Sequence, residues 1–296
     1  MRIAAPLSLL SRQVRQSGYD APVETILSGR GETMVHAPLH WRLADADLIG
    51  EARGTNPDAI FLHGFGGSRT DWDPVWDRLD PTLAAIRYDQ RGFGESRALS
   101  DEGFSHADDL LALLDAEGIA RADLVGISMG GSIATHFALN HPDRVRRLVL
   151  ISPGLMAWDW SEEWRIAWRA MTACARANDL HGARQLWFDH PLFATIRRDP
   201  RLADMLRVSI DRYCCGEWIA DRQHPVLPDV ERLPLLATPT LLLTGEHDLP
   251  DFRLIADMIA GCGQNVRRID WPGHGHMLTL EAPGACAEAI GAFLEA

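Results

Sequence analysis

The chain contains no lysine, because all 29 of its basic residues are arginine. Schiff-base catalysis, the attachment of pyridoxal phosphate and the phosphate-binding lysine of a Walker motif each require an amine, which a guanidinium group cannot replace. The absence of lysine therefore excludes three large classes of enzyme.

Cysteine is scarce, and the five cysteines form an odd set without C-x-x-C spacing. We interpret them as reduced thiols and expect neither a disulfide framework nor a zinc site: Cys174, Cys214, Cys215, Cys262 and Cys286. His274 with His276, and His36 with His40, are close enough in sequence to share a metal, but neither pair has a third ligand or a carboxylate nearby. We expect no metal and no other cofactor.

Long apolar runs are missing as well. Segments such as residues 148–151 and 241–243 are far too short to cross a bilayer, and the N-terminal MRIAAPLSLLSRQVRQ lacks an adequate signal-peptide core. The formal net charge of −12 disfavours nucleic acid and anionic membranes as partners. These features predict a cytoplasmic protein with a small-molecule substrate and no nucleic-acid or membrane partner; a homo-oligomer is compatible with them.

Short apolar segments alternate with helical patterns along most of the chain. Two antiparallel strands are expected to end near residues 34–43, followed by strand-like segments with glycine turns: AIFLHGFGG, LAAIRYDQRGFG, ADLVGISMGG, RLVLISPG and TLLLTGEHD. Between them, residues 105–117 carry leucines on one helical face, and Gly118 stops that helix. Apolar strands alternating with helices predict an α/β fold with a mostly parallel, doubly wound sheet covered on both faces.

One interval breaks this alternation, because residues 154–234 contain no strand-like run. We expect an α/β core formed by residues 1–153 and 235–296, with residues 154–234 inserted as a helical cap. The cap follows the carboxyl end of a strand, where α/β sheets bind ligands. Aromatic residues at helical spacing usually pack in a core, so only a minority of its six tryptophans is expected to face a pocket: Trp158, Trp160, Trp164, Trp168, Trp187 and Trp218.

The stretch GISMGGS places Ser128 between a predicted strand and a predicted helix. Gly126 and Gly130 fit positions where a tight turn brings neighbouring backbone too close for a side chain. Such a turn holds a serine hydroxyl at the surface, with the N-terminus of the following helix directed towards it. A glycine turn required only for packing explains the same short pattern equally well. The assignment of Ser128 as a nucleophile therefore depends on other parts of the chain.

Two further motifs also follow predicted strands. In H-G-F-G-G at residues 63–67, glycines allow backbone N–H groups to point into a cavity, as an oxyanion-binding turn requires. A dinucleotide-binding loop is disfavoured, because Arg69 occupies the last glycine position of G-x-G-x-x-G. T-G-E-H-D places Asp248 after one strand, and G-H-G-H-M places His276 in the loop after the next strand, at residues 266–270.

In combination these motifs resemble the α/β-hydrolase superfamily, whose chain order is nucleophile, acid, histidine. D-x-R-G-x-G-x-S at residues 89–96 is similar to that family's turn after the fourth strand, and we interpret it as structural. The resemblance extends from residue 59 to the C-terminus. It implies that Ser128 attacks a carbonyl, that His276 takes the serine proton and that Asp248 orients the imidazole.

The resemblance also selects among neighbouring candidates. The family places a glutamate five positions after its histidine and a proline two positions later, which Glu281 and Pro283 match for His276 but not for His274. His274 is then expected to make only a loop hydrogen bond. Other acids would require a different loop geometry, and they remain as alternatives to Asp248: Asp251 and Asp159.

The resemblance further implies an oxyanion hole formed by the N–H groups of Phe65 and Met129. A serine at position 128 disfavours dehalogenase and epoxide hydrolase chemistry, which need a carboxylate nucleophile. The cap and GISMGG resemble those of small bacterial esterases and enol-lactonases, and this resemblance implies a carboxylic ester or lactone substrate. We expect the acyl part to be modest and apolar and to contact Trp158, Trp187 and Leu249.

Other reactions remain open, because this fold hosts many chemistries. The sequence HGFGGS lacks the H-G-x-G-P-G turn of meta-cleavage-product hydrolases, which lowers the expectation of carbon–carbon hydrolysis. Acyltransferases and perhydrolases use the same three residues. A ligand-binding receptor with vestigial turnover is the alternative outside catalysis.

Overall fold

The structure is a computed structural model that describes residues 24–27 and 33–295. The N-terminal stretch that we judged to lack a signal-peptide core, and the side chain of His36, lie outside the described residues.

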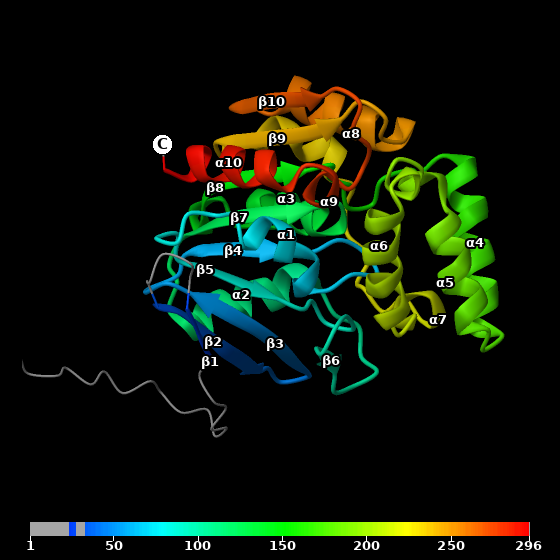
Figure 1. Ribbon diagram of the computed structural model, residues 1–296, viewed down its shortest axis with the longest axis horizontal. Helices are drawn as coiled ribbons and strands as arrows, with labels where there is room; N and C mark the ends of the chain where they lie inside the picture. The colour runs from blue at the N-terminus through cyan, green and yellow to red at the C-terminus, as the bar shows by residue number, and fades with distance from the viewer. Residues whose placement is uncertain (1–23, 28–32, 296) are drawn as a thin grey trace, which may run out of the picture.

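A single sheet organises the described chain (Figure 1). Its strand order is β1-β2-β3-β5-β4-β7-β8-β9-β10, with the short β6 paired to β3. The strands from β5 to β10 along this order are parallel, whereas β1, β2 and β3 pair antiparallel. Their bounds are β1 Glu24–Leu27, β2 Thr33–Arg42, β3 Ala46–Arg53, β4 Ala59–Leu62, β5 Ala85–Tyr88, β6 Arg97–Ala98, β7 Ala122–Ile127, β8 Val145–Ile151, β9 Thr240–Gly245 and β10 Val266–Trp271.

The predicted parallel strands all occur, and the mostly parallel α/β sheet is confirmed. The expectation of only two antiparallel strands ending near residues 34–43 was incomplete, because β3 follows as a third. β3 pairs with β5 on its other side and thereby connects the antiparallel edge to the parallel strands.

Helices cover both faces of the sheet because each buried parallel strand directs alternate side chains to opposite faces. On one face, Leu62 and Leu124 pack with α2 His106–Glu117, α3 Met129–Asn140 and α8 Pro250–Cys262. On the other face, Phe61 and Val125 pack with α1 Asp73–Trp76, α9 Leu278–Glu281 and α10 Pro283–Leu294. The helix predicted at residues 105–117 begins after its capping residue Ser105 and ends at Gly118, which is left-handed with φ 69°.

The segment between β8 and β9 folds into helices that lie beyond one end of the sheet (Figure 1). We call residues 154–234 the cap, as defined from the sequence. Its elements are α4 Glu162–Arg176, α5 Leu180–Asp189, η3 Pro191–Phe193, η4 Ile196–Arg198, α6 Pro200–Arg212 and α7 Gly216–Ile219, and η5 Asp229–Leu235 leads back to the core. A third buried cluster joins these helices to Phe93, Phe252 and Leu280 of the core.

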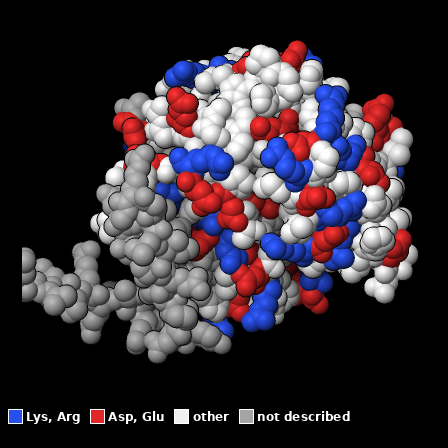
Figure 2. Space-filling model, in the orientation of Figure 1, with Lys and Arg blue, Asp and Glu red and all other residues white. Residues whose placement is uncertain are grey.

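Arginine and acidic side chains are interspersed on the face shown in Figure 2. The described region has no helix that is long and apolar enough to span a bilayer. It also has no group of three potential metal ligands, and its five cysteines are free.

Candidate active site

Ser128 occupies a strained turn between β7 and α3. Its backbone has φ 53° and ψ −114°, a combination that a residue with a side chain rarely adopts. A Cβ on Gly126 would lie 2.7 Å from the amide nitrogen of Gly131, and one on Gly130 would lie 2.7 Å from the carbonyl oxygen of His63. The turn therefore requires glycine at both flanking positions, for the reason inferred from the sequence.

The loop of residues 63–67 follows β4 and lies against this turn. A Cβ on Gly64 would be in van der Waals contact with the Cβ of Ser128, at 3.5 Å. Within the described residues, the backbone N–H groups of Phe65 and Met129 donate to no carbonyl or side chain. Two donors beside Ser128 are thus available to an oxyanion.

Buried His63 anchors this loop as a neutral side chain. Its Nε2 accepts a hydrogen bond from the N–H of Gln90 at 3.0 Å, and its Nδ1 donates to the carbonyl of Gly64 at 2.8 Å. Burial lowers the pKa of His63, which favours the neutral imidazole. The side chain of Gln90 completes the connection by donating to the carbonyl of His63 at 2.8 Å.

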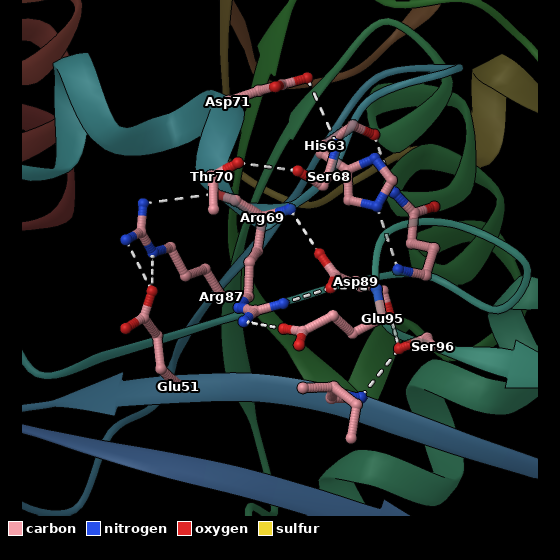
Figure 3. A network of polar contacts seen from close by, with 12 residues as sticks. Glu51, His63, Ser68, Arg69, Thr70, Asp71, Arg87, Asp89, Glu95 and Ser96 are labelled. Atoms are coloured by element: carbon pink, nitrogen blue, oxygen red, sulfur yellow. Dashed lines mark hydrogen bonds and ion pairs between the residues drawn. The ribbon is translucent and has the colours of Figure 1, made fainter. Parts of the chain in front are cut away.

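The turn at residues 89–96 contacts the loop of residues 63–67 through Gln90 and also holds Arg69, which follows that loop (Figure 3). Asp89 accepts from the N–H of Arg69 at 2.7 Å and also pairs with its guanidinium, which contacts Glu95 as well. Ser96 donates to the carbonyl of Asp89 at 2.6 Å and accepts from the N–H of Ile49 at 2.8 Å. These contacts agree with the structural role inferred for D-x-R-G-x-G-x-S.

His276 and Asp248 meet at the carboxyl ends of β9 and β10. The Nδ1 of His276 lies 2.9 and 3.0 Å from the two carboxylate oxygens of Asp248, and both side chains are buried. Among the described residues, the other ring nitrogen, Nε2, has no hydrogen-bond partner. His276 and Ser128 line the same small cavity, so the structure brings together the three residues selected from the sequence.

Glu281 holds the loop that carries His276. Its carboxylate accepts from the N–H of Gly275 at 2.8 Å and from the N–H of Met277 at 3.2 Å, one residue on each side of the histidine. The hydroxyl of Thr195, in the cap, donates to the same carboxylate at 3.0 Å. The glutamate spacing noted in the sequence thus has a physical reason, and the cap takes part in holding this loop.

The alternative candidates are used elsewhere. His274 makes the expected loop hydrogen bond, to the carbonyl of Pro272 at 2.8 Å. Asp251 accepts from the N–H and hydroxyl of Ser161 at 3.1 and 2.6 Å and thereby ties the start of the cap to α8. Asp159 is exposed and pairs with Arg165.

A cavity of about 500 Å³ lies between the cap and Ser128. Four tryptophans of the cap line it together with Phe65 and Phe252 of the core, and five further cap residues add charged or polar side chains. A cavity of this size with mostly apolar walls suits a small organic molecule. The lining residues are Phe65, Ser128, Met129, Ser132, Gly154, Met156, Trp160, Trp164, Arg165, Trp168, Arg169, Trp187, Glu217, Asp221, Gln223 and Phe252.

The lining of this cavity differs in part from the substrate pocket that we expected from the sequence. Trp187 lines it, but Trp158 and Leu249 are not among the described residues that do. Ala157, with φ 53°, turns the chain before Trp158, and the indole N–H of Trp158 points to Asp251 at 3.4 Å. The expectation that a minority of the cap tryptophans face a pocket was wrong, because four of the six line this cavity: Trp160, Trp164, Trp168 and Trp187.

Two titratable cap residues have shifted pKa values near this site. Burial, with smaller contributions from His276 and Arg197, lowers the pKa of His190 to about 4, so its imidazole is neutral at pH 7. Burial, reinforced by Asp221, raises the pKa of Glu217 in the cavity wall to about 7. Neither residue was selected from the sequence.

Comparisons with known proteins agree with this geometry. The family model of the α/β hydrolase fold matches residues 60–173. The 2-hydroxymuconate semialdehyde hydrolase of Pseudomonas sp. (strain CF600) is 30% identical over 278 residues, which cover 89% of this chain and 93% of that protein. The chain belongs to the α/β-hydrolase family. The fold and family expected from the sequence are confirmed, and the protein belongs to an enzyme superfamily.

Other α/β hydrolases match in part or at lower identity. The enol-lactonase from Burkholderia xenovorans LB400 superposes with a TM-score of 0.73 at 23% identity, covering 87% of this chain and all of that one. A provisionally named carbamate hydrolase RutD from Caulobacter sp. (strain K31) is 42% identical over 96 residues. That match spans 31% of this chain and only 36% of the relative's length.

Sequence reasoning missed several residues of this α/β-hydrolase site. Phe252 packs its ring 4.3 Å from the His276 imidazole, centroid to centroid, and Thr195 reaches Glu281 from the cap. Neither belongs to a motif, because their proximity to His276 arises only when distant segments fold together. Trp160, Trp164 and Trp168 were named from the sequence but not assigned to the pocket, although their recurrence every four residues places them along one helical face.

Proposed function

We propose that this α/β hydrolase cleaves a carboxylic ester or lactone through an acyl-enzyme on Ser128. The observation that carries the proposal is the state of His276: its Nδ1 is paired with Asp248, and its Nε2 is unpartnered among the described residues in a cavity shared with Ser128. An imidazole held in this way can accept the serine proton. The expected cytoplasmic location stays a prediction.

In the first step, the Ser128 hydroxyl attacks the substrate carbonyl while its proton passes to Nε2 of His276. Asp248 keeps the proton of Nδ1 in place and stabilises the imidazolium. The N–H groups of Phe65 and Met129 would donate to the resulting oxyanion, and losing one such donor typically costs about 3 kcal/mol of transition-state stabilisation. His276 then protonates the leaving alcohol, and Ser128 retains the acyl group.

In the second step, water attacks the acyl carbonyl and gives a proton to Nε2 of His276. The bond between the carbonyl carbon and Oγ of Ser128 breaks, and His276 returns the proton to Oγ. The products are a carboxylic acid and free enzyme. A lactone yields one hydroxy acid, because its alcohol and acid belong to the same molecule.

The walls of the cavity support an apolar acyl group. Trp160 and Trp164 stack with their ring centroids 4.4 Å apart, and Phe65 packs 4.9 Å from Trp168. Such flat surfaces accept aliphatic or aromatic chains without demanding a precise pattern of hydrogen bonds.

Carbon–carbon hydrolysis is the second candidate, because the full-length relative at 30% identity is a 2-hydroxymuconate semialdehyde hydrolase. We rank it below ester hydrolysis because residues 63–68 read HGFGGS and lack the H-G-x-G-P-G turn. Both reactions use the same three side chains, so substrate panels must separate them.

The proposal is tested with an active-site probe and a substrate panel. A fluorophosphonate should label the wild-type protein once, at Ser128, and Ser128→Ala should abolish the label in intact-protein mass spectrometry. The wild type should hydrolyse short-chain p-nitrophenyl esters and lactones with chelator present. Full labelling of Ser128→Ala would refute the assignment of the nucleophile. Turnover of a vinylogous 1,5-diketone without any ester turnover would favour the second candidate, and tight ligand binding without turnover would favour a receptor.

A further inference from the structure

Two cavities are lined by Ser128, and a third cleft adjoins the smaller of them. The large cap cavity and a small cavity of about 30 Å³ share Ser128, Phe65 and Trp187. A third, open cleft of about 380 Å³ lies between α6 and the segment formed by η1 Arg69–Trp72 and α1. The small cavity and the cleft share four lining residues: Asp71, Leu206, Ser209 and Met277.

We propose that the cleft and the small cavity form a side passage that supplies the deacylating water, separate from the cavity that holds the acyl group. The two cavities adjoin at a neck formed by Asp71 of η1 and Ser209 of α6. The hydroxyl of Ser209 donates to Asp71 at 2.8 Å, so water passes the neck only when this hydrogen bond opens. This inference rests on the proposed acyl-enzyme mechanism and assigns its second substrate, water, to a site of its own.

The size of the small cavity limits what it can hold. A water needs about 10–15 Å³ of accessible space and two to four polar partners. About 30 Å³ therefore admits one or two waters but no larger acceptor. Its lining includes the polar side chains of Ser128, His276, Asp71 and Ser209.

The unpartnered Nε2 of His276 is the base that a water in this cavity would need. Water bound there would donate one hydrogen bond to Nε2 while its oxygen faced the acyl carbonyl carbon on Ser128 Oγ. Attack forms the new C–O bond and transfers one water proton to His276. The C–Oγ bond then breaks, and the same proton passes to Oγ.

The positions of the two larger cavities favour entry from the side. An acyl group held in the cap cavity would lie against Trp168 and Trp187 and would occupy part of that route. The cleft opens between α6 and the core, where Thr70 and Asp73 face Asp204 and Arg212. The lining of the cleft also includes the apolar side chains of Leu206, Met277 and Leu280.

Asp71 is suited to the neck because both of its oxygens are held. One accepts from Ser209, and the other accepts from the N–H of Ser68 at 3.4 Å, a contact visible in Figure 3. Burial raises the pKa of Asp71 to about 6, so the carboxylate is largely ionised at pH 7 and can accept hydrogen bonds from water. The neck thus combines an acceptor with the rotatable hydroxyl of Ser209.

The test blocks the neck and measures the two chemical steps separately. Ser209→Leu fills the neck with an apolar side chain, and Leu206→Phe does so from the previous turn of α6. Ala203→Leu adds a similar side chain to α6 outside the three cavity linings and serves as the control. Acylation is followed as the p-nitrophenolate burst, and deacylation as the decay of the isolated acyl-enzyme by intact-protein mass spectrometry.

We expect Ser209→Leu and Leu206→Phe to slow deacylation at least tenfold while the burst rate changes less than twofold. Ala203→Leu should leave both rates within twofold of the wild type. If either folded blocking variant deacylates at the wild-type rate, or if both steps slow in proportion, the passage is refuted although the acyl-enzyme mechanism stands. If the wild type forms no acyl-enzyme, the proposed function fails and this inference fails with it.

Discussion

Two histidines separated by one residue have different environments. The ring of His276 is buried and paired with Asp248, and Phe252 covers one side of it. The ring of His274 hydrogen-bonds only to the carbonyl of Pro272 among the described residues. Only the first environment combines an orienting carboxylate with access to Ser128.

The first prediction compares these two histidines. His276→Ala should lower kcat/KM for an ester by several orders of magnitude, because removing a triad base costs up to about 10⁶ in rate. His274→Ala should lower it about tenfold or less, since it removes one loop hydrogen bond. The measurement is the steady-state kcat/KM of both variants, with their folding checked by circular dichroism. Reversed effects would move the base to His274.

At the scale of elements, helix α4 supplies much of the cavity wall. Trp164 and Trp168, four residues apart, lie on one face of α4 with nearly parallel rings, 15° apart in plane. Trp187 of α5 packs edge-on against Trp164, with ring centroids 6.2 Å apart. The pocket wall is therefore a property of two packed helices, and altering one ring changes its shape.

A second prediction concerns selectivity. Trp187→Ala should change the relative kcat/KM of esters with short and long acyl chains by tenfold or more, because it removes a ring from the cavity wall. Trp158→Ala should weaken the Asp251 contact at the base of the cap without altering those ratios. The measurement is an acyl-chain series on both variants, with Trp187→Phe as the conservative comparison. Equal proportional losses for all esters in Trp187→Ala would indicate a folding role only.

For the whole molecule, a buried imidazole links stability to pH. His106, at the start of α2, is only 2% exposed, and neither of its ring nitrogens has a partner among the described residues. Burial, with smaller contributions from His63 and Arg91, lowers its pKa to about 3. An unfolded histidine titrates near 6.5. Between these values the unfolded chain binds the extra proton, so stability is fully present above 6.5 and falls as the pH falls towards 3.

The third prediction follows from the lower pKa of His106 in the folded state. Because only the unfolded chain protonates His106 in this range, the free energy of unfolding should fall by about 2 kcal/mol between pH 7 and pH 5. In His106→Leu, the decrease in unfolding free energy between these pH values should be smaller by about that amount, as measured by urea denaturation. His181→Leu, at an exposed position of the cap, is the control and should retain the wild-type pH dependence. The same decrease in His106→Leu as in the wild type would contradict the assignment.

The sequence by itself determined the local features. The parallel strands, the helix between Ser105 and Gly118 and the turn around Ser128 were predictable, because each depends on apolar periodicity, capping residues and glycines within a few positions. The same applies to the selection of His276, Asp248 and Glu281, whose motifs are short and contiguous. These patterns also sufficed to predict the family.

The tertiary structure alone decided which distant side chains meet. Trp158 was expected in the pocket and lies outside the cavity lining, because the backbone turn at Ala157 and the contact with Asp251 redirect it. Glu217 enters the cavity wall, and Asp71 faces Ser209 across 138 positions of sequence. No local pattern encodes such distances, because they depend on how the cap helices pack against the loops at the carboxyl end of the sheet.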